Sequence, residues 1–155
     1  MYFLLAFATL AVGHFILEVP TSIGYEDIKE GSPPCGGFDI TSRAGVTEWP
    51  LAGAPLKIIS THPGAQYTIQ ATLLTDAATA SGGNFNFTRM LPLLTQSGRG
   101  GLCLPAVPGI AAWQGKDAVV QVIQEATDGQ LYQVCKARFS QRAGDPDSSL
   151  SADTV

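Results

Sequence analysis

Histidine, cysteine and charged residues are scarce in this chain of 155 residues. It has 2 His and 3 Cys, and 14% of its residues are Asp, Glu, Lys or Arg. The 9 Lys and Arg stand against 13 Asp and Glu, giving a formal net charge of −4, so the chain lacks the basic surface that binds a nucleic-acid backbone. With 45% hydrophobic residues, the composition is that of one globular domain. We therefore expect a single folded domain and no nucleic-acid partner.

The sequence also lacks the common motifs of nucleotide-binding, hydrolase and zinc proteins. It contains no P-loop, no G-x-S-x-G, no HExxH and no C-x-x-C pair, and no G-x-G-x-x-G follows a predicted strand. Any chemistry must therefore depend on the few histidines and cysteines or on isolated polar residues.

The first hydrophobic run is too short to span a membrane. Residues 2–12 are almost all apolar, whereas a spanning helix needs about 20 such residues. The run has the length of a signal-peptide core, and Ala11 and Gly13 provide the small residues that signal peptidase requires. We predict that residues 1–13 are a signal peptide and that the mature chain begins at His14. The alternative is a buried first strand over residues 3–19.

Export would place the cysteines in an oxidising compartment, where thiols pair. Three cysteines leave one thiol over, and both a Cys35–Cys135 and a Cys35–Cys103 disulfide are compatible with the sequence, because spacing does not fix connectivity. Asn86 begins an N-glycosylation sequon in a Gly- and Asn-rich stretch. This sequon predicts a surface loop of a secreted glycoprotein.

The mature chain is dominated by short strand patterns. Five segments are rich in β-branched or alternating apolar residues, namely 14–20, 56–61, 67–74, 118–125 and 130–139. The Thr-Asp-Gly sequence at 127–129 predicts a hairpin between the last two. No long stretch has a helical period, so the pattern predicts an all-β antiparallel sandwich.

The segments between and after these strands are expected to be irregular. Residues 76–98 are small and polar, which predicts a long loop with a short helical turn. The tail over residues 140–155 is polar and poor in apolar residues, so we expect it to be disordered. The folded domain is accordingly predicted to span residues 14–139.

The two histidines could form a metal site. If His14 is the mature amino terminus, its α-amine and its own ring can chelate one ion, and His62, expected at a strand end, can add a third nitrogen. Neutral nitrogen ligands in a planar arrangement favour Cu(II), which tops the Irving–Williams order. Before cleavage the amine is an amide, so the site cannot form. The alternative is that His14 merely follows the cleavage point and His62 ends a strand.

Seven short motifs occur in order along residues 14–133. They are the His-Phe start, Pro-Cys-Gly-Gly at 34–37, Arg43, Trp-Pro-Leu at 49–51, His62, Gly-x-Cys-x-Pro at 101–105 and Asp-Gly-x-Leu-Tyr-Gln at 128–133. Together they resemble the fungal copper acquisition factors, which are secreted copper proteins similar to lytic polysaccharide monooxygenases. The resemblance implies an immunoglobulin-like β-sandwich that binds one Cu(II) in a histidine brace, with two nitrogens from His14 and one from His62.

The same resemblance implies where and how the protein works. It implies a copper-binding, non-catalytic role in copper acquisition at the extracellular side of the plasma membrane or in the cell wall. A GPI anchor and a surface copper transporter as partner belong to this interpretation. The alternative is a lytic polysaccharide monooxygenase that cleaves glycans oxidatively with the same copper.

The chain departs from the family pattern after Gln133. The family usually continues with Cys-Ala-Asp, whose Asp is a further copper ligand, whereas this chain continues with Val-Cys-Lys-Ala. Lys136 or Ala137 therefore occupies the ligand position, depending on the alignment. Glu125 and Asp128 are possible substitutes, although strand-surface and hairpin roles are more common for residues at such positions.

The departure suggests an error in the gene structure. Val134-Cys135 can be encoded by GTATGT, a fungal splice-donor hexamer. We hypothesise that residues from 134 onward are translated intron and that a true carboxyl terminus with its anchor signal was lost. Transcript reads that cross the codon for Gln133 would decide this hypothesis.

Overall fold

The computed structural model describes residues 13–40, 45–79 and 85–141. The predictions for most of the signal peptide, for Arg43 and for the tail beyond residue 141 concern residues outside these ranges. Within the described part, no helix is long and apolar enough to cross a membrane.

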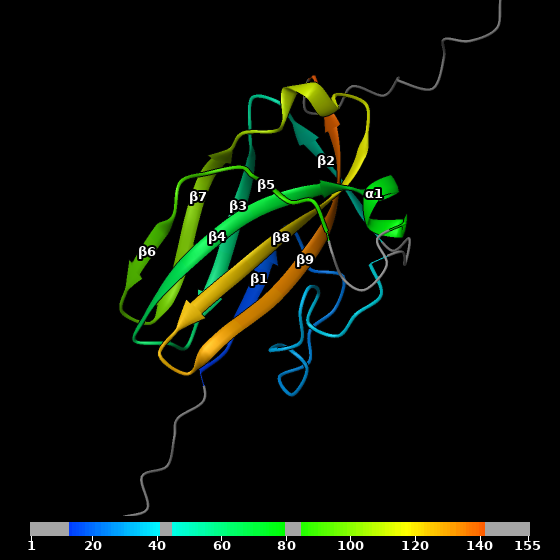
Figure 1. The fold of residues 1–155 in the computed structure, drawn as a ribbon. Coiled ribbons are helices and arrows are strands. Elements are labelled where there is room, and N and C mark those ends of the chain that lie inside the picture. Colours follow the sequence, from blue (N-terminus) through cyan, green and yellow to red (C-terminus); the bar gives the residue numbers. More distant parts are fainter. Residues whose placement is uncertain (1–12, 41–44, 80–84, 142–155) are drawn as a thin grey trace, which may run out of the picture.

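Two β-sheets pack face to face in the described part of the chain (Figure 1). The smaller sheet has the order β1-β3-β7, with β1 at Phe15–Val19, β3 at Ala54–Ser60 and β7 at Gly100–Val107. The larger sheet has the order β2-β9-β8-β4-β5, and β6 also pairs with β4. Its strands are β2 Val46–Pro50, β4 Gly64–Leu73, β5 Thr88–Arg89, β6 Leu94–Ser97, β8 Asp117–Ala126 and β9 Gly129–Ser140. The predicted all-β sandwich is confirmed.

Most neighbouring strands are antiparallel, and β2 pairs with β9 in parallel. All five predicted strand segments are present, and the turn at residues 127–128 joins β8 to β9 as expected. The α-helix α1, at Leu74–Thr79, and the 3-10 turn η2, at Ala111–Trp113, are short.

Sequence patterns missed several strands at the sheet margins. The loop predicted over residues 76–98 contains β5 and β6, and β2 and β7 were not expected. β7 opens with two glycines and contains Pro105, and both residue types argue against a strand. As an edge strand β7 pairs on one side only, where a proline is tolerated because not every backbone N–H needs a partner.

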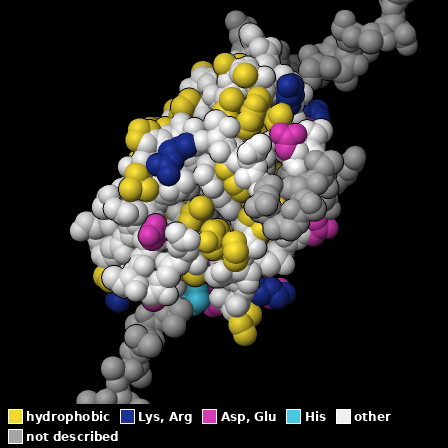
Figure 2. Space-filling model, in the orientation of Figure 1, with side chains coloured by type: hydrophobic (Ala, Val, Ile, Leu, Met, Phe, Trp, Pro, Cys, Tyr) yellow, Lys and Arg dark blue, Asp and Glu magenta, His cyan; other side chains and the backbone are white. Residues whose placement is uncertain are grey.

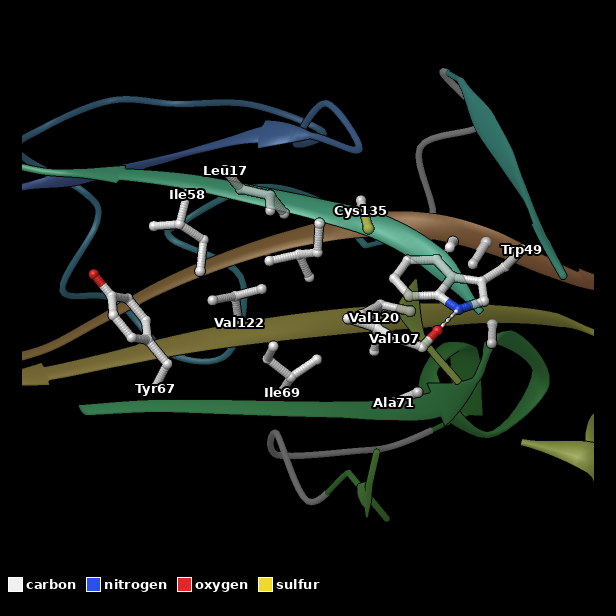
Figure 3. Close-up of a cluster of buried hydrophobic side chains, with 14 of the residues drawn as sticks. Leu17, Trp49, Ile58, Tyr67, Ile69, Ala71, Val107, Val120, Val122 and Cys135 are labelled. Carbon is white, nitrogen blue, oxygen red and sulfur yellow. Dashed lines mark hydrogen bonds between the residues drawn. The ribbon is translucent and has the colours of Figure 1, made fainter. Parts of the chain in front are cut away.

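The interior between the sheets is apolar. Along β3, buried residues alternate with more exposed ones, as expected for a strand with one face against the core. Trp49 lies in this interior, where its Nε1–H donates a hydrogen bond of 2.9 Å to the carbonyl of Val107 (Figure 3). That bond satisfies the only polar atom of the largest buried side chain.

Strand β9 passes through Gln133 without a break. It pairs with β8 from Gly129 to Arg138 and with β2 over residues 136–140. The apolar residues that follow Gln133 are buried in the two core clusters of the molecule: Val134, Cys135, Ala137 and Phe139. This segment is therefore part of the folded core.

The three cysteines are all described, and all are free thiols. Cys135 lies in the main interior cluster, whereas Cys35 packs with Val134 in a second cluster. Adjacent residues of a strand point to opposite faces, so Cys35 and Cys135 lie on different sides of β9. Cys103 is exposed on β7 of the other sheet. Neither disulfide considered from the sequence is formed, because the sheets separate the three thiols.

Candidate metal centre

Four segments meet at the end of the sandwich where β1 begins (Figure 1). They are the residues before β1, the connection from β3 to β4, the loop between β1 and β2, and the turn from β8 to β9. Figure 2 shows a histidine side chain with an acidic side chain beside it at this end of the surface. The structure thus gathers residues from distant parts of the sequence at one place.

Thr61 holds the backbone of His14. The His14 N–H donates to Oγ1 of Thr61 at 2.8 Å, and the Thr61 N–H donates to the His14 carbonyl at 2.9 Å. The Thr61 hydroxyl also donates to that carbonyl at 3.1 Å. Because Thr61 directly precedes His62, these bonds tie the backbone of His14 to the residue next to the second histidine.

The ring of His14 contacts a buried carboxylate. Nδ1 of His14 lies 3.0 Å from Oε2 of Glu30, whose side chain is 1% exposed. Oε1 of Glu30 accepts hydrogen bonds from the Phe15 N–H at 3.3 Å and from Nε2 of Gln133 at 3.0 Å. Burial raises the pKa of Glu30, and these hydrogen bonds oppose that shift.

Sequence reasoning missed Glu30. Glu30 lies in a polar segment between strands, where the nearby acidic residues Glu26 and Asp27 are exposed. No periodicity marks it as buried. Nothing in the sequence around Glu30 distinguishes it from these exposed acidic neighbours.

His62 is 3% exposed and has two different ring environments. Nδ1 lies 3.5 Å from Oδ1 of Asp128, whereas Nε2 is buried and has no hydrogen-bond partner. A Cβ atom placed on Gly13 would lie 2.5 Å from Nδ1 of His62, so Gly13 and the ring are in close contact. Most buried polar atoms are satisfied, and an exception therefore points to a missing partner.

The donor atoms at this end suit copper. In the described part of the chain, no group of three or more His, Cys, Asp or Glu side chains is arranged to hold a metal ion. A histidine brace does not need such a group, since it takes two imidazoles and one amine. The unpartnered Nε2 of His62 meets the requirement for one neutral nitrogen ligand. In the chain as described, Gly13 precedes His14, so the His14 nitrogen is an amide that donates to Thr61.

A family model for the copper acquisition factor BIM1-like domain matches residues 12–153. The chain belongs to this family. The match extends through β9, so the expectation that the resemblance to copper acquisition factors stops at Gln133 is wrong.

Two curated fungal relatives are similar to this family member. An uncharacterized protein of Aspergillus fumigatus is 30% identical over 150 residues, which are 92% of this chain and 60% of the relative. A lytic polysaccharide monooxygenase-like protein of Yarrowia lipolytica is 30% identical over 134 residues, which are 83% of this chain and 51% of the relative. The chain thus spans between half and three fifths of these relatives, and the family supports a copper-related role.

The structure separates the four positions considered for the absent family aspartate. Ala137 is in the interior cluster, and Lys136, its neighbour on β9, is buried on the opposite face. Glu125 is exposed, and its Oε2 accepts a long hydrogen bond of 3.5 Å from Gln130. Asp128 is the one of the four that contacts a predicted ligand, His62.

Proposed function

We propose that this copper acquisition factor family member is an extracellular Cu(II)-binding protein with a histidine brace formed by His14 and His62. The buried, unpartnered Nε2 of His62 is the observation that carries the proposal. The hydrogen bonds between His14 and Thr61 support it, since they hold the second ligand residue beside the first. Bound copper would be held as one Cu(II) ion by three neutral nitrogens. The His14 ring nitrogen that can chelate with its own amine is Nδ1, so copper binding would require this atom to leave its contact with Glu30.

Removal of residues 1–13 is part of this proposal. A peptide nitrogen with Gly13 attached does not provide the neutral amine of the brace. The His14 nitrogen already lies against Thr61, and cleavage would convert it to an amine at that place. Signal-peptide removal and completion of the copper site are thus the same event.

The decisive experiment compares two forms of the protein that differ by one residue. Protein that begins at His14 should bind one Cu(II) with a nitrogen-rich, tetragonal EPR spectrum. Protein that retains Gly13 at its amino terminus should give a different spectrum, since an amino-terminal Gly-His chelates Cu(II) through the Gly13 amine, the deprotonated His14 amide and the His14 ring and does not need His62. Equal affinity and identical spectra for the two forms would rule out the brace.

A substitution tests the second ligand. His62→Ala in the protein that begins at His14 should weaken Cu(II) binding severely, as measured by calorimetric titration. Glu125→Ala is the control, because Glu125 is exposed and its Oε2 accepts a long hydrogen bond of 3.5 Å from Gln130. Unchanged copper affinity in the His62→Ala protein would remove His62 from the site.

The structure favours binding over glycan oxidation. Both tryptophans are described, and neither is exposed: Trp49 is buried and Trp113 packs partly buried against the interior cluster. A flat face of exposed aromatics, which an enzyme for insoluble glycans would use, is therefore not formed by them. The enzyme alternative predicts oxidised oligosaccharides when the copper-loaded protein is incubated with reductant, peroxide and chitin or cellulose, and their absence would favour the binding role.

The extracellular location rests on features with separate tests. Asn86 is exposed between α1 and β5, which leaves the sequon accessible to glycosylation. A mobility shift of the secreted protein after deglycosylation, absent in Asn86→Gln, would establish both export and modification. Release of the protein from the cell surface by a phospholipase would reveal a GPI anchor. In cells that display the protein on their surface, delivery of copper to a surface transporter can then be tested.

A further inference from the structure

Asp128 joins the hairpin of the larger sheet to the second histidine. It lies in the two-residue turn between Ala126 and Gly129, which pair across the hairpin. Its Oδ1 lies 3.5 Å from Nδ1 of His62, and its Oδ2 accepts a hydrogen bond of 3.0 Å from the Gly13 N–H. No other carboxylate is paired with the His62 ring in the described part of the chain.

The two ring nitrogens of His62 therefore have unequal surroundings. A neutral imidazole carries one proton, and the hydrogen bond made by one nitrogen sets the state of the other. A proton on Nδ1 puts an N–H beside the carboxylate, at an ion-pair distance of 3.5 Å, and leaves a lone pair on Nε2. In the opposite tautomer the Nδ1 lone pair would lie beside the negative carboxylate, and a buried N–H at Nε2 would have no acceptor. Electrostatic repulsion in the first case and an unmade hydrogen bond in the second both disfavour this tautomer.

We propose that Asp128 is a positioning residue that selects the Nδ1–H tautomer of His62 and so makes Nε2 the copper ligand. The inference rests on the proposed function, and it assigns Asp128 a role that acts through the histidine. Carboxylates that accept the second N–H of a metal-bound imidazole orient the ring and increase its basicity. Cleavage after Gly13 would remove the backbone partner of Oδ2.

The first test uses the metal-free protein that begins at His14. Nitrogen-15 NMR of the neutral imidazoles should show His62 with its proton on Nδ1. Asp128→Ala should increase the Nε2–H form, whereas Asp128→Asn retains an acceptor oxygen and should preserve most of the Nδ1–H form. Glu125→Ala is the matched control on the same hairpin, and it should leave the His62 tautomer unchanged. A His62 tautomer that does not respond to Asp128→Ala overturns the inference.

The second test measures copper. Asp128→Ala should weaken Cu(II) binding roughly 10–100-fold, the range typical for loss of such an outer partner, and should alter the EPR spectrum. Glu125→Ala should change neither. Weaker binding with the Nδ1–H tautomer retained would show that Asp128 acts other than through His62, and would overturn the inference.

The two proposals fail in different ways. If His62→Ala leaves copper affinity unchanged, the brace itself is wrong. If His62→Ala abolishes binding while Asp128→Ala matches the unsubstituted protein in affinity and spectrum, the brace stands and the positioning role falls. Circular dichroism and the unfolding midpoint of each variant identify a change that arises from misfolding, and Asp128→Asn then provides the test in a more conservative background.

Discussion

The two ends of the sandwich are built on opposite physical principles. Figure 3 places Trp49 and Tyr67 at opposite ends of the buried cluster. Near Trp49 the contacts are aromatic: its ring meets that of Phe139 edge-on at 6.4 Å, and Trp113 lies 6.1 Å from the same phenylalanine. This end stabilises the fold by removing apolar surface from water.

The other end buries polar groups instead. Glu30, Gln124 and Gln133 are all buried there, and each makes hydrogen bonds that offset the cost of leaving water. Nε2 of His62 lacks such a partner, as does Oε1 of Gln124, and of these two atoms the imidazole nitrogen is the proposed metal ligand. The comparison indicates that the apolar end serves stability, while the polar end keeps one buried nitrogen available for a ligand.

The largest effect on stability is expected at the apolar end. Trp49→Ala removes a fully buried indole and leaves a cavity, so the free energy of unfolding should fall by about 3–5 kcal/mol. Urea unfolding measures this loss. The remaining folded protein should bind copper as before, because Trp49 has no contact with either histidine. A copper affinity that falls together with stability would remove the distinction between the two ends.

A smaller loss is expected from Glu30→Ala at the polar end. The substitution leaves Nε2 of Gln133 and the Phe15 N–H short of an acceptor, which should cost about 1–3 kcal/mol. Glu30→Gln keeps an acceptor oxygen and should cost less. Glu26→Ala is the matched control, since Glu26 forms an exposed ion pair with Lys29 at 2.8 Å and such pairs contribute about 0–1 kcal/mol. If Glu30→Ala and Glu26→Ala lowered the free energy of unfolding equally, the buried carboxylate would stabilise the fold no more than an exposed one.

The same contrast explains what the sequence could predict. The apolar end follows from strands with a two-residue period, so the core strands and the sandwich were predictable. The margins were not, because β7 begins with glycines and contains Pro105, and pairing in space overrode its local preference. The sheet order and the parallel pairing of β2 with β9 depend on contacts between distant residues, which no local pattern encodes.

At the polar end, the sequence predicted only the site residues whose residue type is rare in the chain. His14 and His62 could be named because the chain has only 2 histidines. Glu30 was missed, and Asp128 was named as a possible substitute ligand but with a hairpin role preferred, since each is one of 13 acidic residues and only the fold shows which of them contact a histidine. The cysteine pairing was not predictable either, because it depends on where the fold places three thiols that lie in a loop, on β7 and on β9.

Tyr67 lies at the polar end of the buried cluster, and its ring and its hydroxyl can be tested separately. The hydroxyl donates to Oε1 of Gln96 at 2.8 Å and accepts from Nε2 of Gln124 at 2.6 Å, while the ring packs against Phe15. Tyr67→Phe keeps the ring, so it should cost about 1 kcal/mol in urea unfolding, the typical value of one hydrogen bond. A loss as large as that of Trp49→Ala would indicate that the polar network extends into the apolar end.

The smallest effect on stability is expected from the cysteines. Their reactivity also tests which face of β9 each buried thiol packs against. Burial raises the pKa of Cys35 and of Cys135 to about 12, from an ordinary value of 9.0. In the folded protein at pH 8 a thiol reagent should therefore modify exposed Cys103 quickly and the other two slowly, whereas all three should react in denaturant. Fewer than three reactive thiols in denaturant would mean that a disulfide forms after all.

The raised pKa of Cys35 and Cys135 in the folded protein also makes its stability depend on pH. Their contribution to the free energy of unfolding is present below about pH 9 and is lost as the pH rises toward about 12, because only the unfolded chain releases these protons in that window. The free energy of unfolding should accordingly fall with alkaline pH, and Cys135→Ala should make that slope shallower, since it removes the thiol that lies on the interior face.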